Sequence, residues 1–280
     1  MNGPWRTVPL QKKAWCMSSQ EAFLARVRRA LHKDAVPPPS RPSLWWSDTD
    51  VAKAAAQLQT RLAAQRPALL AQVQQELEAA GGVVAHVHSA PEAVAYITHL
   101  AQQKDAHLVV RWQSELLEAL EVDAALHQQD ITVHTTALPP GTGAGEASSM
   151  AAITTRRQEL RELLARADLG LSGVDYVIAE TGTLVLMARA GQMRGVSLLP
   201  PVHVAVARTS QVIATLTDYL LLAQAAGADP QQYLSSCVSF VTGPSRTGDI
   251  ELTLTVGVHG PGELHLVLLD EPAASRTAEA

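Results

Sequence analysis

Strand-like and helix-like segments alternate between residues 83 and 135, and this alternation constrains the fold more than any other feature of the sequence. The strand-like stretches are residues 83–88, 108–112 and 131–135, and segments with helical spacing follow Ser89 and Ser114. Strands that alternate with helices of this length form βαβ units, in which the strands run parallel. The pattern therefore predicts an α/β fold built on a parallel sheet.

The second half of the chain is richer in strands. Short apolar stretches separated by Gly and Pro are typical of buried strands and turns, and they lie at residues 174–179, 184–188, 202–207, 237–241, 252–258 and 264–269. Residues 212–226 have helical spacing, and the residues expected to face inward are Ile213, Leu216, Leu220 and Ala223. Nothing between the two halves resembles a flexible linker, so we predict one α/β domain at 46–272 with a β-rich second part.

The first 45 residues are predicted to lie outside this domain. Residues 1–16 have no periodicity, and we interpret them as a disordered tail upstream of the true start. Residues 17–45 combine a basic helix with a Pro-rich linker. The helix is either a solvated face or an arm that docks on an acidic partner or on this protein's own acidic body. Within the domain, residues 50–78 are helical, with a break expected at Pro67, and residues 273–280 form a predicted tail.

Composition excludes several classes of protein. A hydrophobic share of 47% and a charged share of 18% are typical of a folded globular chain. The net charge of −5 argues against general nucleic-acid binding. The 2 cysteines exclude a disulfide framework and a four-cysteine zinc or iron–sulfur site within this chain. No apolar stretch reaches the ~20 residues of a membrane helix, and we find no signal-like segment, so a cytoplasmic location is predicted.

A glycine-rich run at residues 141–145 resembles a dinucleotide-binding motif but departs from it. Glu146 occupies the position of the last glycine, and the run follows Pro139-Pro140 rather than a strand. We interpret it as a mobile loop, with a lid as the functional alternative.

Glu180-Thr181-Gly182-Thr183 lies between two strongly apolar stretches. Tetrapeptides that contain glycine commonly close hairpins, which makes Glu180 a solvent-facing turn residue. The alternative is a carboxylate placed for acid, base or nucleophilic chemistry. The sequence leaves both interpretations open.

A second polar turn, at residues 243–251, combines hydroxyl groups, a guanidinium and two acids. Ser245, Arg246 and Thr247 suit a carboxylate or phosphate ligand, because arginine can bind such groups in a bidentate way. The alternative is a structural arginine paired with Asp249 or Glu251.

Two histidines, His203 and His259, lie near prolines, and a histidine side chain could donate or accept a proton near neutral pH. We expect His203, at the start of a strand, to be a satisfied residue at the edge of the core. His259 lies at a strand end beside glycine and is the better candidate for a site. No ligand spacing supports a metal site made from these two, and we predict no metal site. The sequence around five other histidines indicates no function for them: His86, His88, His107, His127 and His134.

Four motifs resemble those of the LUD-domain family, and within it the lactate-utilization C group. They are Ala179-Glu180-Thr181-Gly182-Thr183-Leu184-Val185-Leu186, Ser197-Leu198-Leu199-Pro200-Pro201-Val202-His203, Gly243-Pro244-Ser245-Arg246-Thr247-Gly248-Asp249-Ile250-Glu251 and Gly257-Val258-His259-Gly260-Pro261. The resemblance covers about residues 50–270. Gly262 stands where a basic residue often follows the proline, which removes one possible surface charge.

The resemblance implies a Rossmann-like sheet with a β-rich second part, similar to the group of ribose-5-phosphate isomerase, glucosamine-6-phosphate deaminase and the CoA-transferases. It also implies a role in the oxidation of L-lactate to pyruvate beside cysteine-rich iron–sulfur partner proteins. Because this chain has too few cysteines for a cluster, no cofactor is expected in it, and iron–sulfur clusters are expected in the partner subunits.

For the site, our hypothesis is that Glu180, Asp249 or His259 handles protons, while substrate is bound by Thr181, Gly182, Thr183, Ser245, Arg246 and Thr247. This requires the turn around Glu180 and the turn around Arg246 to meet at one rim of the sheet and form an anion-binding hollow. Two alternatives stay open. One is a free-standing CoA-transferase or sugar-phosphate isomerase that uses Glu180, and the other is a non-catalytic regulatory protein that binds an anion.

Overall fold

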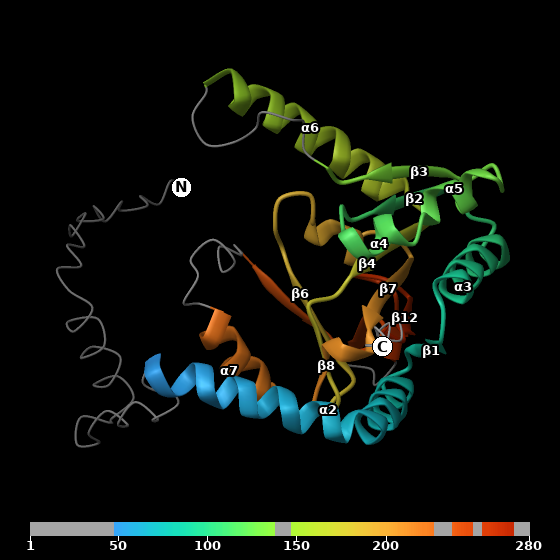
Figure 1. Cartoon of the computed structure of the whole chain (residues 1–280). Helices are drawn as coiled ribbons and strands as arrows, with labels where there is room; N and C mark the ends of the chain where they lie inside the picture. Colours follow the sequence, from blue (N-terminus) through green and yellow to red (C-terminus); the bar gives the residue numbers. More distant parts are fainter. Residues whose placement is uncertain (1–47, 138–146, 227–236, 249–253, 272–280) are drawn as a thin grey trace, which may run out of the picture. The chain divides into compact units, whose positions relative to one another are not determined.

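The computed structural model describes residues 48–137, 147–226, 237–248 and 254–271 (Figure 1). The predicted tails, the basic helix and the glycine-rich run lie outside these residues. The helices are α2 (Asp48–Ala79), α3 (Ala90–Gln103), α4 (Glu115–Ala119), α5 (Val122–His127), α6 (Ala147–Arg166), α7 (Leu216–Ala226) and the short 3₁₀ turns η1 (Arg194–Ser197) and η2 (Thr209–Gln211). The strands are β1 (Val83–Val87), β2 (Leu108–Arg111), β3 (Thr132–Thr135), β4 (Leu169–Gly173), β5 (Tyr176–Ile178), β6 (Thr183–Met187), β7 (Val202–Arg208), β8 (Val212–Ile213), β9 (Val238–Val241), β10 (Arg246–Gly248), β11 (Leu254–Val256) and β12 (Glu263–Leu269).

A parallel sheet of six strands forms the centre of the fold, in the order β1-β12-β7-β4-β2-β3. The predicted α/β class with a parallel sheet is therefore confirmed. Strand β4 was not predicted, because its sequence contains Gly170 and Gly173, which are rare in strand interiors. The structure explains Gly170, since a Cβ there would collide with the backbone carbonyl of Val196 in η1.

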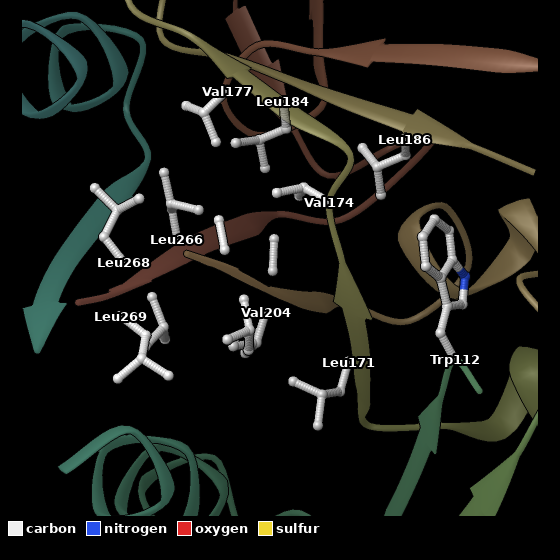
Figure 2. Packing of buried hydrophobic residues seen from close by; sticks show 14 of the residues in the cluster. Trp112, Leu171, Val174, Val177, Leu184, Leu186, Val204, Leu266, Leu268 and Leu269 are labelled. Atoms are coloured by element: carbon white, nitrogen blue, oxygen red, sulfur yellow. The ribbon is translucent and has the colours of Figure 1, made fainter. Parts of the chain in front are cut away.

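The β-rich part consists of a four-stranded sheet, in the order β8-β5-β6-β9, and the antiparallel hairpin β10-β11. Side chains from both larger sheets share one hydrophobic core, which Figure 2 shows close up. Leu171 of β4 and Leu266 of β12 belong to the same cluster as Val177 of β5 and Leu184 of β6. This shared core packs the β-rich part against the parallel sheet.

The two faces of the parallel sheet carry different segments. His265 in β12 is hydrogen-bonded to Tyr96 of α3, so α3 covers its face. Leu264 and its neighbour in β7, His203, point to the opposite face, because side chains alternate along a strand. Gly170 pairs with His203 and faces η1, so η1 covers this second face.

Helix α2 runs through Pro67 without ending, contrary to the predicted break. Leu62 lies before the proline and Leu69 after it, and both are buried on the side of α2 that packs on α7 and β8. The packing on both sides of Pro67 outweighs the cost of a proline inside a helix, about 3 kcal/mol.

The inward face predicted for residues 212–226 is correct in part, since Ile213 and Ala223 are buried. Ile213 belongs to strand β8, and the helix begins only at Leu216. Leu216 and Leu220 are exposed, whereas Tyr219 and Leu222 are buried. The reason is a reciprocal cap, in which the side chains of Thr215 and Asp218 each accept the backbone N–H of the other residue. This cap starts α7 later than the apolar spacing suggests.

Candidate functional site

A cavity of about 220 Å³ opens where β7 and β12 begin and β9 ends. Polar side chains in its wall are those of Ser197, His203, Thr242, Ser245 and His259. Apolar side chains complete the wall, among them Leu198, Phe240 and Leu264. A small, mostly apolar hollow with a few polar groups has the composition expected of a small-molecule site.

Two loops that are distant in sequence form the mouth of the cavity, and Ser245 joins them. Its backbone N–H donates to the carbonyl of Pro261 at 2.9 Å, and its carbonyl accepts from the N–H of Gly257 at 2.9 Å. Gly260 allows the close approach, since a Cβ there would lie 3.1 Å from the Cβ of Ser245. The structure thus brings together two predicted site residues, Ser245 and His259, in one cavity wall.

His203 lies in the same wall and is fully buried. Its Nε2 is 2.8 Å from the Oγ of Ser172, whereas its Nδ1 has no hydrogen-bond partner in the described part of the chain. Burial, helped by the nearby His265, lowers the pKa of His203 to about 3. The ring is therefore neutral at physiological pH, and its Nδ1 is enclosed rather than exposed to solvent. We expected a satisfied core residue, which holds only for Nε2.

Glu180 lies in the turn between β5 and β6 and is not among the described residues that line the cavity. Its Oε1 accepts the backbone N–H of Leu216 at 2.8 Å, at the start of α7, and its own N–H donates to the carbonyl of Ala214 at 3.0 Å. A carboxylate at the first N–H groups of a helix stabilises the helix end. In this position Glu180 holds α7 against the small sheet.

The rest of the Glu180 turn is packed rather than open. Gly182 has a φ of +61°, and a Cβ on it would lie 2.5 Å from the backbone nitrogen of Leu77 in α2. The hydroxyl groups of Thr181 and Thr183 lie 2.6 Å apart, and that of Thr183 lies 2.7 Å from the hydroxyl of Thr242. This chain of hydroxyl groups ends at the cavity wall, because Thr242 is part of it.

Arg246 begins β10, and its guanidinium donates to the carbonyl of Ala80 just after the end of α2. It lies over Gly81, where a Cβ would collide with it. A cation at a helix C-terminus satisfies a free carbonyl and complements the helix dipole. Arg246 and its neighbour Thr247 are not among the described residues that line the cavity. Asp249, the third predicted proton-handling residue, lies outside the described residues.

The two polar turns therefore meet on a common support, the last turn of α2. Gly182 packs on the backbone at Leu77, and Arg246 binds Ala80. Gly243 lies in the cavity wall and packs on Ala80, so the cavity adjoins this support. Sequence reasoning missed His203 as a cavity residue. Its place directly after Pro200-Pro201, in one of the recognised motifs, was the available signal.

A separate cluster lies at the opposite end of the same sheet, where His86 and His88 meet Asp270. The sequence predicted no function for these histidines.

In the described part of the chain, no helix is both long and apolar enough to cross a membrane.

Comparison with protein families places the chain in one of them. The sequence profile of the LUD domain matches residues 70–269. Lactate utilization protein C of Halalkalibacterium halodurans is 41% identical over 110 residues, which are 38% of this chain and 46% of that protein. Lactate utilization protein B of Shouchella clausii is 27% identical over 235 residues, which are 72% of this chain and 48% of that protein. The chain thus spans about half the length of these relatives. A solved structure, that of a DUF162 family protein from Deinococcus radiodurans, has a TM-score of 0.47 and 21% identity, and covers 73% of this chain and 98% of its own.

Proposed function

Since the chain belongs to the LUD-domain family, we propose that it is a component of an L-lactate utilization system and that it binds a small carboxylate, such as lactate or pyruvate, in the cavity beside His203. The names of its relatives, lactate utilization proteins B and C, support the first half of this proposal. The cavity supports the second half.

The observation that carries the binding proposal is the free Nδ1 of His203. A buried polar atom without a partner costs about 1–3 kcal/mol, and a ligand that supplies the missing hydrogen bond recovers it. The cavity, at about 220 Å³, is smaller than a drug-sized site and suits a ligand of a few heavy atoms.

The low pKa of His203 defines what it does in this proposal. A neutral imidazole is a hydrogen-bond partner for a carboxylate or hydroxyl oxygen and a weak base, so His203 orients the ligand. The hydroxyl of Ser245 adds a second hydrogen bond. His259, exposed at the mouth, is the group we assign to proton exchange with solvent.

Oxidation of lactate to pyruvate releases electrons as well as protons, and a second protein must accept the electrons. With 2 cysteines, this chain offers too few thiolates for a four-cysteine cluster. We therefore assign the electron path to iron–sulfur partner subunits, which bind this chain within a larger assembly.

A titration of the purified full chain with L-lactate and pyruvate, followed by calorimetry and by NMR of isotope-labelled histidine, tests the binding proposal. We expect saturable binding and a shifted resonance of His203. The variant His203→Gln weakens binding at least tenfold, corresponding to loss of a buried hydrogen bond. The matched control His127→Gln, at an exposed histidine of α5, binds as the wild type does.

Unaltered binding by His203→Gln would contradict the cavity assignment. The role in lactate oxidation is tested separately, by lactate-dependent dye reduction with and without iron–sulfur partners from the same source. Full activity of the isolated chain would contradict the assembly. Labelling of Glu180 by acyl-CoA and borohydride would favour the transferase alternative. The hydrogen bond from the N–H of Leu216 to the Glu180 carboxylate argues against that alternative.

A further inference from the structure

His86 and His88 point to the same side of the chain where β1 ends. Residues two apart on a strand face the same way. The burial pattern agrees, because both histidines are exposed while Val87 between them is buried. The His-x-His spacing therefore places two imidazoles next to each other, with ring centroids 5.1 Å apart.

Strand β12 brings a carboxylate to the same point. β12 pairs in parallel with β1, so that Val87 lies opposite Leu269 and the next residue, Asp270, follows beside the two histidines. The N–H of Asp270 donates to the carbonyl of Val87 at 3.0 Å, which fixes its backbone. Its Oδ1 then lies 2.7 Å from Nε2 of His86, and its Oδ2 lies 2.7 Å from Nδ1 of His88.

The cluster is held from behind by the start of α3. Glu92 accepts the backbone N–H of His88 at 3.0 Å and the hydroxyl of Ser89 at 2.8 Å. This positions the backbone of His88 before any ligand arrives.

The arrangement has the chemistry of a metal site. The three ligand atoms, two imidazole nitrogens and one carboxylate oxygen, all lie within 4.8 Å of one another. Imidazole favours zinc and other first-row transition metals, whereas magnesium and calcium prefer oxygen ligands. Three protein ligands on one side leave coordination positions open toward solvent, as in sites that bind a further ligand.

The position in the fold supports the same conclusion. In open α/β sheets, the carboxyl ends of the parallel strands are the common location of ligand sites. His86, His88 and Asp270 lie at the carboxyl ends of β1 and β12, whereas the His203 cavity lies at the amino ends of β7 and β12. The two sites are separate and do not share residues.

We propose that His86, His88 and Asp270 form a binding site for a divalent first-row transition metal of the zinc type. The ion replaces the hydrogen bonds between the two imidazoles and Asp270, and it is bound through Nε2 of His86, Nδ1 of His88 and the Asp270 carboxylate. Each imidazole binds as the neutral ring with its proton on the other nitrogen, and any further proton is released to solvent. Nothing in this proposal depends on the carboxylate cavity.

The test uses the tag-free full chain, stripped of metal and titrated with Zn²⁺ against a chromophoric indicator. We expect one site per chain and, with Co²⁺ in place of Zn²⁺, an absorption spectrum typical of nitrogen and oxygen ligands. Mg²⁺ at the same concentration does not compete. His88→Gln removes a ligand whose side chain is 70% exposed, so the fold is retained, and we expect affinity to fall more than about tenfold. Asp270→Asn is expected to lower affinity in the same way.

The matched control is His107→Gln. His107 is also exposed and lies near a carboxylate, 4.0 Å from Asp105, but it has no second imidazole beside it among the described residues. It should bind Zn²⁺ as the wild type does. Wild-type protein without a stoichiometric site, or His88→Gln with wild-type affinity, would overturn the proposal and leave the cluster as a hydrogen-bonded link between β1 and β12.

Discussion

At the scale of single residues, His203 differs most from what its sequence context suggests. It is buried, neutral and only half satisfied. The unfolded chain restores an ordinary histidine pKa of about 6.5, well above the folded value of about 3. Below pH 6.5 the unfolded state therefore binds more protons than the folded state, and His203 favours unfolding as the pH falls.

This predicts a pH dependence of stability. Between pH 6.5 and pH 4, each unit of acidification costs up to about 1.4 kcal/mol through His203 alone. Burial also lowers the pKa of His265, which adds a loss in the same direction. Urea denaturation at several pH values measures the slope for the wild type and for His203→Gln, which should lose less stability on acidification. Equal slopes would show that the pKa of His203 is not lowered in the folded chain.

Gly182 carries a second prediction at this scale. Alanine there combines a positive φ with a collision against the α2 backbone, and we expect a loss on the order of 2–4 kcal/mol. Gly248 is the matched control, since a Cβ on it meets nothing within 4 Å, and Gly248→Ala should stay within about 0.5 kcal/mol. Thermal or urea unfolding measures both. Similar losses in the two variants would show that the turn does not pack on α2 as described.

At the scale of elements, helix α7 depends on polar contacts at its first turn. Asp218 accepts the N–H of Thr215 at 3.0 Å and donates its own N–H to the Thr215 hydroxyl at 3.1 Å. Its carboxylate also binds the guanidinium of Arg61 in α2 at 2.7 Å. Glu180 adds one further acceptor at Leu216. These contacts set where α7 starts and therefore which of its faces is buried.

The contacts predict unequal effects of truncation. Asp218→Ala removes a nearly buried carboxylate with several partners and should cost about 2–4 kcal/mol. Glu180→Ala removes an exposed helix cap and should cost about 1 kcal/mol. Urea denaturation of both variants provides the comparison, and carboxylate binding should survive Glu180→Ala. Loss of binding in that variant, with stability retained, would return Glu180 to the site.

At the scale of the whole molecule, the two proposed sites lie at opposite ends of β12. Leu264 lines the cavity, and Asp270, six residues later, belongs to the metal cluster, so about 20 Å of strand separates them. Groups this far apart without shared partners act independently. We expect the affinity for lactate to change less than twofold when Zn²⁺ is present, measured by calorimetry. A larger change would show that β12 couples the sites.

The sequence predicted those features that depend on neighbouring residues, and it missed those that depend on contacts between distant segments. Local alternation and turn residues predicted the parallel sheet, its β-rich second part and the placement of Ser245 and His259 in loops. Strand β4 was missed because its Gly170 is required by a close approach to the backbone of η1. The buried face of α7 was predicted only in part because the cap at Asp218 sets where the helix starts. The proposed metal site was missed because Asp270 is 184 positions from His86 and 182 from His88 in the sequence. Only the pairing of β1 with β12 brings these residues together.

The place of β12 between β1 and β7 has a consequence for biosynthesis. Among the described strands, β1 comes first in the sequence and pairs only with β12, so its partner is synthesised more than 170 residues later. Such long-range pairing is slow, and it exposes unpaired edges to aggregation in the meantime. A nascent chain arrested before Glu263 should therefore remain a client of chaperones, with β1 not yet paired to the other strands of its sheet.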